Sequence, residues 1–371
     1  MYLCVFSNFL YTSNHEIYTV FTLLSTGKIV GGGGTITGMN FFDHNYNNII
    51  SVENLLHAWR EFRRGKKQKR DVMEFERNLM EHILNVHYDL KYRKYRHSGY
   101  DAFKITDPKP RDIHKASVRD RIVHHLIYNS LYSYFDERFI HDSYSCRIAK
   151  GTHKALQRFK QFSGKVSKNN TKTCWILKCD IRKFFANIDH ITLKRILSEY
   201  IKDKQLLELL DRVIDSFSTE GKNDVGLPLG NLTSQLLVNV YMNEFDHFMK
   251  RILKVKYYIR YADDFIILHE DKNYLENLVP QISDFLEIEL KLSLHPIKLF
   301  IKTLSSGLDF LGWVHFPNHR TLRTATKRRM LGNPGIYAGD EAVVNSYRGL
   351  LSHGNGWKLT QRINNIYVKV I

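Results

Sequence analysis

The chain has 371 residues, of which 43% are hydrophobic and 13% aromatic, with 55 Lys and Arg against 38 Asp and Glu. This length and hydrophobic content predict a globular protein of about two to three domains and exclude an intrinsically disordered one. The net charge of +17 favours a polyanionic partner, most simply nucleic acid, and a basic protein without such a partner is the alternative.

Cysteine usage and hydropathy bear on the compartment. The four cysteines, Cys4, Cys146, Cys174 and Cys179, show no CxxC spacing, which predicts a reducing compartment and no zinc site. No apolar run approaches the roughly 20 residues that span a bilayer, and residues 17–24 lack the basic flank of a signal peptide. We therefore expect a cytoplasmic protein with no membrane partner.

The N-terminal third begins with an extension of uncertain role, residues 1–48, that contains a flexible tract of four glycines. Ser51 is predicted to cap a helix over residues 52–62, and a second helix is predicted over residues 72–86. A basic and aromatic cluster at residues 91–97 suits backbone phosphates and stacked bases, although a solvated helix face has the same composition.

Four arginines lie among polar turn residues in the next block, residues 109–156. Planar guanidinium groups are natural clamps for phosphates, and Arg147 is the one we predict to contact a triphosphate. For Arg119 and Arg121 an equally good interpretation is that each ties two elements together through a carboxylate. The four are Arg111, Arg119, Arg121 and Arg147.

A buried strand is predicted over residues 173–181, with Asp180 at its end beside a turn, where a carboxylate can face a metal ion. One helix is predicted over residues 193–217. A breaker segment follows at residues 226–231, and then a helix from Leu232 to about Ile252.

Residues 256–269 (KYYIRYADDFIILH) have the pattern of a β-hairpin, with two apolar runs around a tight polar turn. Asp263 and Asp264 are adjacent carboxylates at the tip of this otherwise buried element. Because burying unpaired charge is costly, such a pair indicates a cation nearby, and a divalent metal is the simplest candidate. A solvated hairpin corner is the alternative.

The remaining elements are a helix over residues 273–287, a run at residues 290–300 that contains Lys298, and a second hairpin at residues 308–315. Residues 317–371 are basic, with helices predicted at residues 343–351 and 357–367. They hold no HNH-like cluster, which we expect to disfavour an intron protein with its own endonuclease.

Taken in order, these segments resemble the sequence motifs of reverse transcriptases from Ser51 to the C-terminus. Any one motif is weak, and seven in the correct order are a strong signal. Two segments resemble the motifs of the fingers, residues 111–123 and 144–156. The segments that resemble the palm motifs are Asp180 with Phe184 and Phe185 (motif A), residues 230–235 (motif B), residues 261–264 (motif C), Lys298 (motif D) and residues 310–313 (motif E).

The resemblance implies an α+β, right-hand polymerase fold with fingers, a palm whose antiparallel sheet packs on helices, and a short helical thumb. The implied domains are the N-terminal extension (1–48), N-terminal helices and fingers (49–172), palm with some finger elements (173–316) and thumb (317–371).

The resemblance also implies the catalytic roles. Phosphoryl transfer to a primer hydroxyl uses two divalent cations about 4 Å apart, here two Mg²⁺ per active site, with Mn²⁺ possible. The implied metal-binding residues are Asp180, Ile181, Asp263 and Asp264, with Asp264 in a supporting role. Lys298 is either a cation or general acid beside the leaving phosphates, or a solvent-facing lysine.

Substrate contacts follow from the same resemblance. Phe185 occupies the place of an aromatic steric gate that excludes a ribose 2′-hydroxyl, so the substrates would be dNTPs; the alternative is a plain core phenylalanine. The other implied dNTP-binding residues are Arg147, Leu229, Gly230 and Gln235. The implied nucleic-acid-binding residues, for template RNA and for cDNA or primer, are Arg111, Arg119, Tyr261, Gly312 and Trp313.

One departure from the common pattern narrows the resemblance. Leu229 stands where most reverse transcriptases have Gln, and Gln235 stands where they have Pro, as in the enzymes of diversity-generating retroelements. This similarity implies error-prone copying of template adenines from a template-repeat RNA to diversify a target gene, in a prokaryotic cell or by a phage-encoded enzyme. It also implies a small basic accessory variability protein that forms an oligomeric ring. Drift in an ordinary polymerase loop is one alternative. Others are a retron, group II-like or phage-defence reverse transcriptase and a non-catalytic RNA-binding scaffold.

Overall fold

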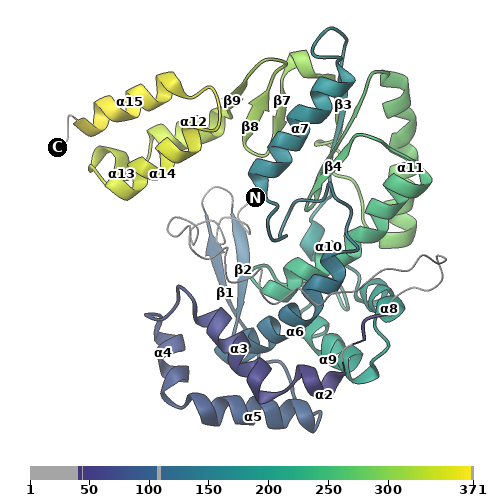
Figure 1. Ribbon diagram of the computed structural model, residues 1–371, viewed down its shortest axis with the longest axis vertical. Coiled ribbons are helices and arrows are strands. Elements are labelled where there is room, and N and C mark those ends of the chain that lie inside the picture. Colours follow the sequence, from purple (N-terminus) through teal and green to yellow (C-terminus); the bar gives the residue numbers. More distant parts are fainter. Residues whose placement is uncertain (1–40, 44, 107–109, 369–371) are drawn as a thin grey trace, which may run out of the picture.

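The computed structural model describes residues 41–43, 45–106 and 110–368 (Figure 1). Most of the predicted N-terminal extension therefore lies outside the described residues. Within them, no helix combines the length and apolar character that crossing a bilayer requires.

The N-terminal helices pack together at one end of the molecule (Figure 1). Ser51 caps the second of them as predicted, because its hydroxyl accepts a hydrogen bond from the Asn54 N–H. The single helix predicted over residues 72–86 is wrong: Asn78, with φ −119° and ψ 41°, breaks it into two. These helices are α2 (Tyr46–Ile49), α3 (Val52–Arg63), α4 (Arg70–Arg77) and α5 (Leu79–Lys91).

A two-stranded hairpin follows, formed by β1 (Tyr100–Ile105) and β2 (Arg111–Ala116), which pair antiparallel. The sequence did not predict β1, whose residues are mostly exposed and carry no apolar alternation. Two long helices come next, α6 (Val118–Asp136) and α7 (Thr152–Val166). Helix α6 packs on α3 and α10.

The central element is a four-stranded antiparallel sheet in the order β4-β5-β3-β6. Its side chains alternate between two cores, as expected for a sheet covered on both faces. Leu177 and Ile267 join the core that contains α10 and α11, whereas Ile176 and Ile266 join the core that contains α7. The strands are β3 (Trp175–Asp180), β4 (Tyr258–Tyr261), β5 (Asp264–His269) and β6 (Phe300–Thr303).

The helices around this sheet differ from the prediction at two points. The helix predicted over residues 193–217 is two helices, because Ile201 is extended and the Asp203 carboxylate caps a new helix. The helix that begins at Leu232 ends in a π-helical turn, η3 (Phe248–Ile252). The helices are α8 (His190–Tyr200), α9 (Lys204–Ile214), α10 (Leu232–His247) and α11 (Lys272–Leu290).

The C-terminal part forms a small sheet, drawn in light green in Figure 1, followed by helices drawn in yellow, which lie away from α2–α5. The predicted hairpin at residues 308–315 is confirmed, and a third strand extends it. The helices predicted at residues 343–351 and 357–367 are both confirmed. The elements are β7 (Leu308–Phe310), β8 (Trp313–His315), β9 (Arg320–Leu322), α12 (Thr324–Leu331), α13 (Pro334–Tyr337), α14 (Glu341–Leu351) and α15 (Trp357–Val368).

Candidate active site

Carboxylates from two distant segments meet at one end of the central sheet. Asp180 ends β3 and is paired across the sheet with Asp264, the first residue of β5. Paired residues of antiparallel strands place their side chains on the same face. Asp263 lies in the two-residue turn before β5, and its carbonyl accepts a hydrogen bond from the Ile181 N–H at 3.2 Å. The fold thus brings together the four residues implied to bind metal.

Two lysines neutralise part of this charge. Lys298 Nζ lies 2.7 Å from Asp180 Oδ1, and Lys178 Nζ lies 3.1 Å from Asp264 Oδ2. The Lys298 side chain is 44% exposed against 15% for Asp180, so it reaches into the site from solvent. Lys298 is therefore more than a solvent-facing lysine, because its ammonium forms an ion pair with Asp180. Lys178 is a neighbour that the sequence reading missed, although a lysine inside an apolar strand (WILKCD) was the available signal.

The carboxylates retain uncompensated charge. Burial raises the pKa of Asp264 to about 6, and the Lys178 ammonium opposes that rise. Burial, and then the charge of Asp180, raises the pKa of Asp263. Asp264 Oδ1 is buried and has no hydrogen-bond partner among the described residues. Clustered carboxylates with raised pKa values and an unpartnered oxygen are a set of hard oxygen donors that suits a divalent cation such as Mg²⁺. The residues fit the expected metal ions.

The predicted gate residue, Phe185, follows the strand that ends at Asp180. Phe185 is half-buried in the short helix η2 (Phe184–Asn187), which follows Lys183 in a left-handed conformation. Its carbonyl accepts a hydrogen bond from the Leu227 N–H at 2.8 Å, so the segment that leads to Leu229 is anchored to it. Its side chain also packs against the central core, and the geometry is compatible with both the gate and the core interpretation.

The loop before α10 docks on the β1–β2 hairpin. The His114 N–H donates to the Leu229 carbonyl at 3.0 Å, and the Asn231 side-chain amide donates to the His114 carbonyl at 2.9 Å. Gly230 has φ +108°, and a Cβ there would lie 2.9 Å from Ile113 Cγ2. This position therefore needs glycine for both conformation and space.

Leu229 and Gln235 are both half-buried. Leu229 immediately precedes Gly230 in this loop, and Gln235 lies in the first turn of α10. The hairpin contact to His114 uses the backbone of Leu229, so its side chain is not consumed by that contact.

Arg147 has a different environment from the one predicted. Its guanidinium donates to Asp136 Oδ1 at 2.7 Å and to the carbonyls of Asp136, Ile140 and Ser143. The side chain is 5% exposed. These bonds lock the loop before α7 to the end of α6. They use four of the five guanidinium N–H donors, so at most one remains for a triphosphate.

Arg119 and Arg121 each tie two elements together through a carboxylate, which was the alternative interpretation for both. Arg119 pairs with Asp89 at 2.7 Å, and Arg121 pairs with Asp71 at 2.6 Å, so each joins α6 to an earlier helix. Arg111 is half-buried at the start of β2, opposite Ile105. The phosphate-binding roles of Arg111 and Arg119 stay predictions.

Three further residues predicted to bind nucleic acid lie mainly inside the protein. Tyr261 is 4% exposed, and its hydroxyl lies 3.1 Å from the Thr152 hydroxyl. Trp313 is 2% exposed and packs so closely on Gly354 that a Cβ there would lie 2.0 Å from the indole ring. Gly312, with φ +88°, makes the turn between β7 and β8. Tyr261 therefore contacts the start of α7 and Trp313 contacts the C-terminal part of the chain, and neither ring presents a stacking surface.

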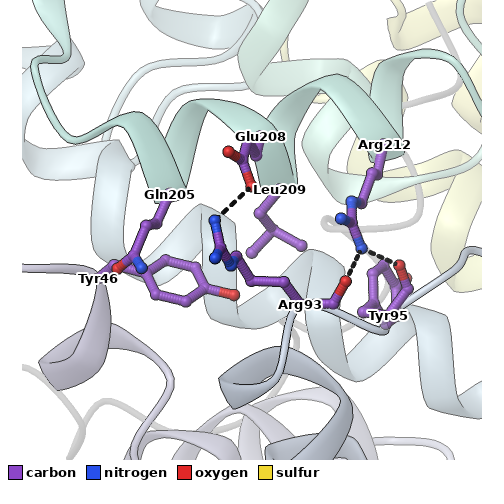
Figure 2. Close-up of a pocket in the computed structure, with 7 residues that line it drawn as sticks. All are labelled: Tyr46, Arg93, Tyr95, Gln205, Glu208, Leu209 and Arg212. Carbon is purple, nitrogen blue, oxygen red and sulfur yellow. Dashed lines mark hydrogen bonds and ion pairs between the residues drawn. The ribbon is translucent and has the colours of Figure 1, made fainter.

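The basic cluster at residues 91–97 lines a small pocket against α9 (Figure 2). Arg212 donates to the carbonyls of Arg93 and Tyr95 at 2.6 and 2.8 Å, and Arg93 lies 3.7 Å from the Glu208 carboxylate. Tyr95 is 1% exposed, which excludes its ring from base stacking. The exposed side chains of this segment still offer a basic surface.

Comparison with known proteins agrees with this geometry. The family model described as reverse transcriptase (RNA-dependent DNA polymerase) matches residues 105–315, more than half of the chain. The group II intron-encoded protein LtrA of Lactococcus lactis subsp. cremoris is 24% identical over 292 residues, which cover 61% of this chain and 47% of the relative. Protein YkfC of Escherichia coli is 26% identical over 260 residues, covering 59% and 65%.

Other similarities are more partial. The putative COX1/OXI3 intron 2 protein of Saccharomyces cerevisiae is 24% identical over 276 residues, covering 58% of this chain and 30% of the relative. The chain thus spans between 30% and 65% of these relatives' lengths. A Candida albicans telomerase structure, solved with a TWJ fragment of telomeric RNA, aligns with 65% of this chain and 51% of its own, with 11% identity and a TM-score of 0.48.

The matched segment runs from the β1–β2 hairpin through the carboxylate site to β8. It contains the antiparallel sheet, the helices that cover it and the paired carboxylates at its end, which together are the palm of a right-hand polymerase fold. The chain belongs to the reverse transcriptase (RNA-dependent DNA polymerase) family.

Proposed function

We propose that this protein is an RNA-directed DNA polymerase that extends a primer with dNTPs on an RNA template. The observation that carries the proposal is the meeting of Asp180, Asp263 and Asp264 at one end of the sheet, with Lys298 on Asp180. Magnesium ions held there would activate the primer hydroxyl and neutralise the leaving pyrophosphate. The chain's own part is to hold the carboxylates ionised and in place.

Each neighbouring residue has a distinct proposed task. Lys298, whose ammonium contacts Asp180, would supply positive charge or a proton to the leaving phosphates. Phe185 would exclude ribonucleotides by contact with the 2′-hydroxyl. The loop at residues 229–231, held by His114, would form the wall against the nascent base pair.

We further propose that the enzyme serves a diversity-generating retroelement and copies template adenines with errors. Support comes from Leu229 and Gln235, because an alkyl group in place of a hydrogen-bonding amide removes a polar anchor at the nascent base pair. A small basic accessory protein that forms a ring, together with the template RNA, would complete the system in the cytoplasm.

The test uses purified protein, a defined RNA template with primer, dNTPs and Mg²⁺, with and without the accessory protein, followed by sequencing of the cDNA. We expect cDNA with errors concentrated opposite adenine, and no cDNA from Asp263→Asn. Leu229→Gln should lower the error frequency at adenine, whereas Leu232→Gln, three residues later on the same loop and helix, is the matched control and should not.

The outcomes separate the alternatives. Faithful copying at adenine by the unmodified protein would reject the mutagenic proposal and favour a retron, group II-like or phage-defence reverse transcriptase. The similarity to an intron-encoded protein makes this the second candidate. Full biological function in Asp263→Asn/Asp264→Asn would reject polymerisation itself and favour an RNA-binding scaffold.

A further inference from the structure

We propose that His190, Asp215 and Asp224 form a second metal site, separate from the polymerase carboxylates, which binds one divalent transition-metal ion such as Zn²⁺. The three residues come from the start of α8, the end of α9 and the loop that follows α9. One nitrogen of His190 and one carboxylate oxygen from each aspartate all lie within 4.8 Å of one another. The proposal does not depend on the polymerase activity.

The tautomer of His190 is set by its surroundings. Its Nε2 lies 2.7 Å from the Gly226 carbonyl oxygen, and because a carbonyl only accepts, Nε2 must carry the proton. The neutral ring then has its lone pair on Nδ1. This nitrogen is buried, has no hydrogen-bond partner among the described residues, and faces Asp215 Oδ1 at 3.5 Å. A histidine whose second nitrogen donates to a carbonyl is the usual arrangement of a metal ligand.

The distances suit a small cation. Zinc binds imidazole nitrogen and carboxylate oxygen at about 2.0–2.2 Å, so neighbouring ligand atoms around it are roughly 3.3–3.5 Å apart. The His190–Asp215 separation of 3.5 Å already has this value. Asp224 is exposed, so its carboxylate can move the remaining distance without disturbing the core. A nitrogen with two carboxylates favours zinc over magnesium, which prefers oxygen ligands alone.

Lys194 is the competing cation. Its Nζ lies 2.7 Å from both oxygens of Asp215. A bound metal ion would share this carboxylate with the lysine or displace it, which makes the expected affinity moderate. The rival explanation for the geometry is a doubly protonated His190 that forms an ion pair with Asp215.

The site would fix the segment that leads to the active site. The backbone N–H of His190 donates to the Asp224 carbonyl. The backbone N–H groups of Gly226 and Leu227 donate to the carbonyls of Ile188 and Phe185, respectively. An ion at His190 would therefore hold residues 215–226 against the start of α8 and stabilise the run that ends at Leu229. The prediction of no zinc site rested on cysteine spacing and did not consider this histidine.

The experiment measures metal uptake by the full chain in an Asp263→Asn/Asp264→Asn background, which removes the polymerase carboxylates. Protein stripped with a chelator is titrated with Zn²⁺, and bound metal is counted by mass spectrometry while thermal unfolding is followed in parallel. We expect about one Zn²⁺ per chain with a rise in Tm, no equivalent effect of Mg²⁺ at the same concentration, and slower amide exchange over residues 215–226.

Asp224→Asn is the decisive variant, because asparagine tolerates the positive φ of +54° at this position and the residue is exposed. It should weaken Zn²⁺ binding by at least about tenfold and abolish the Tm rise. Glu220→Gln removes a neighbouring exposed carboxylate in the same loop and should leave both unchanged. Equal Zn²⁺ binding by Asp224→Asn, or a protein that takes up no Zn²⁺, would overturn the proposal and leave the imidazolium ion pair as the explanation.

Discussion

Arg260 and Asp246 form a fully buried, two-point ion pair directly behind the carboxylate turn. Arg260 Nε lies 2.8 Å from Asp246 Oδ1, its second nitrogen lies 2.6 Å from Oδ2, and the two side chains are 1% and 0% exposed. The same guanidinium donates to the carbonyl of Ala262, which has a left-handed φ of +56° in the turn. The pair therefore links α10 to the residue that precedes Asp263.

Replacing Arg260 with methionine should destabilise the protein by about 3–5 kcal/mol, because the buried Asp246 carboxylate would lose its only charged partner and keep only the Tyr258 hydroxyl among the hydrogen bonds that the structure describes for it. Urea unfolding measures this change. The double variant Arg260→Met/Asp246→Leu should recover part of the loss, since it removes the orphaned charge. Arg195→Met breaks an exposed pair with Glu199 and should cost less than about 1 kcal/mol. A similar cost for both arginines would contradict the argument.

Phe185→Ala should reduce discrimination between dNTPs and ribonucleotides by at least about tenfold, because the ring would no longer meet a 2′-hydroxyl. Single-nucleotide incorporation with matched dNTP and rNTP measures it as a ratio of kcat/KM values. Phe184→Leu is the control: Phe184 is 3% exposed and packs edge-on against Phe185, so its loss should lower Tm without changing sugar selectivity. Unchanged selectivity in Phe185→Ala would favour the plain core interpretation.

Local patterns predicted the hairpin that carries the carboxylates. Alternating apolar residues around an Asp-Asp turn specify a hairpin by themselves, and Asp180 at the end of an apolar strand follows the same logic. The cap at Ser51 was predictable because a capping hydroxyl bonds a backbone group three residues away. These features depend on neighbours in sequence.

Features that depend on distant partners were not predictable from local patterns. Arg147 has the sequence context of an exposed turn residue, yet Asp136 and nearby carbonyls accept from four of its five guanidinium donors. Trp313 is buried because Gly354, some 40 residues later, leaves room for its ring. The break at Ile201 has no glycine or proline to mark it, and its isolated bridge to Phe42 shows that tertiary pairing replaces helix there.

Stability should fall between about pH 6.5 and pH 4, in part through His315. Burial, and next the charge of Arg320, lowers the pKa of His315 to about 4. Between the unfolded and folded pKa values only the unfolded chain takes up a proton, so the free energy of unfolding falls as the pH falls, by up to about 1.4 kcal/mol per pH unit.

Urea unfolding at pH 7, 6 and 5 measures this slope. His315→Leu, which also removes a buried nitrogen without a partner, should be less sensitive to pH than the unmodified protein. Val314→Ala on the same strand should change the free energy of unfolding by the same amount at all three pH values. Parallel curves for the protein and His315→Leu would show that another group sets the slope.

Gly230→Ala should impair both stability and primer extension. The φ of +108° is strained for any side chain, at a cost of about 1–3 kcal/mol, and the new methyl group would lie 2.9 Å from Ile113, whose branched side chain is stiff. Gly221→Ala is the matched control, because its φ of +76° imposes strain in open space. Urea unfolding and kcat for extension should both show a larger loss at Gly230, and Ile113→Ala should restore part of it. Equal losses in the two glycine variants, with no rescue, would mean that the contact between the hairpin and the loop does not position the site.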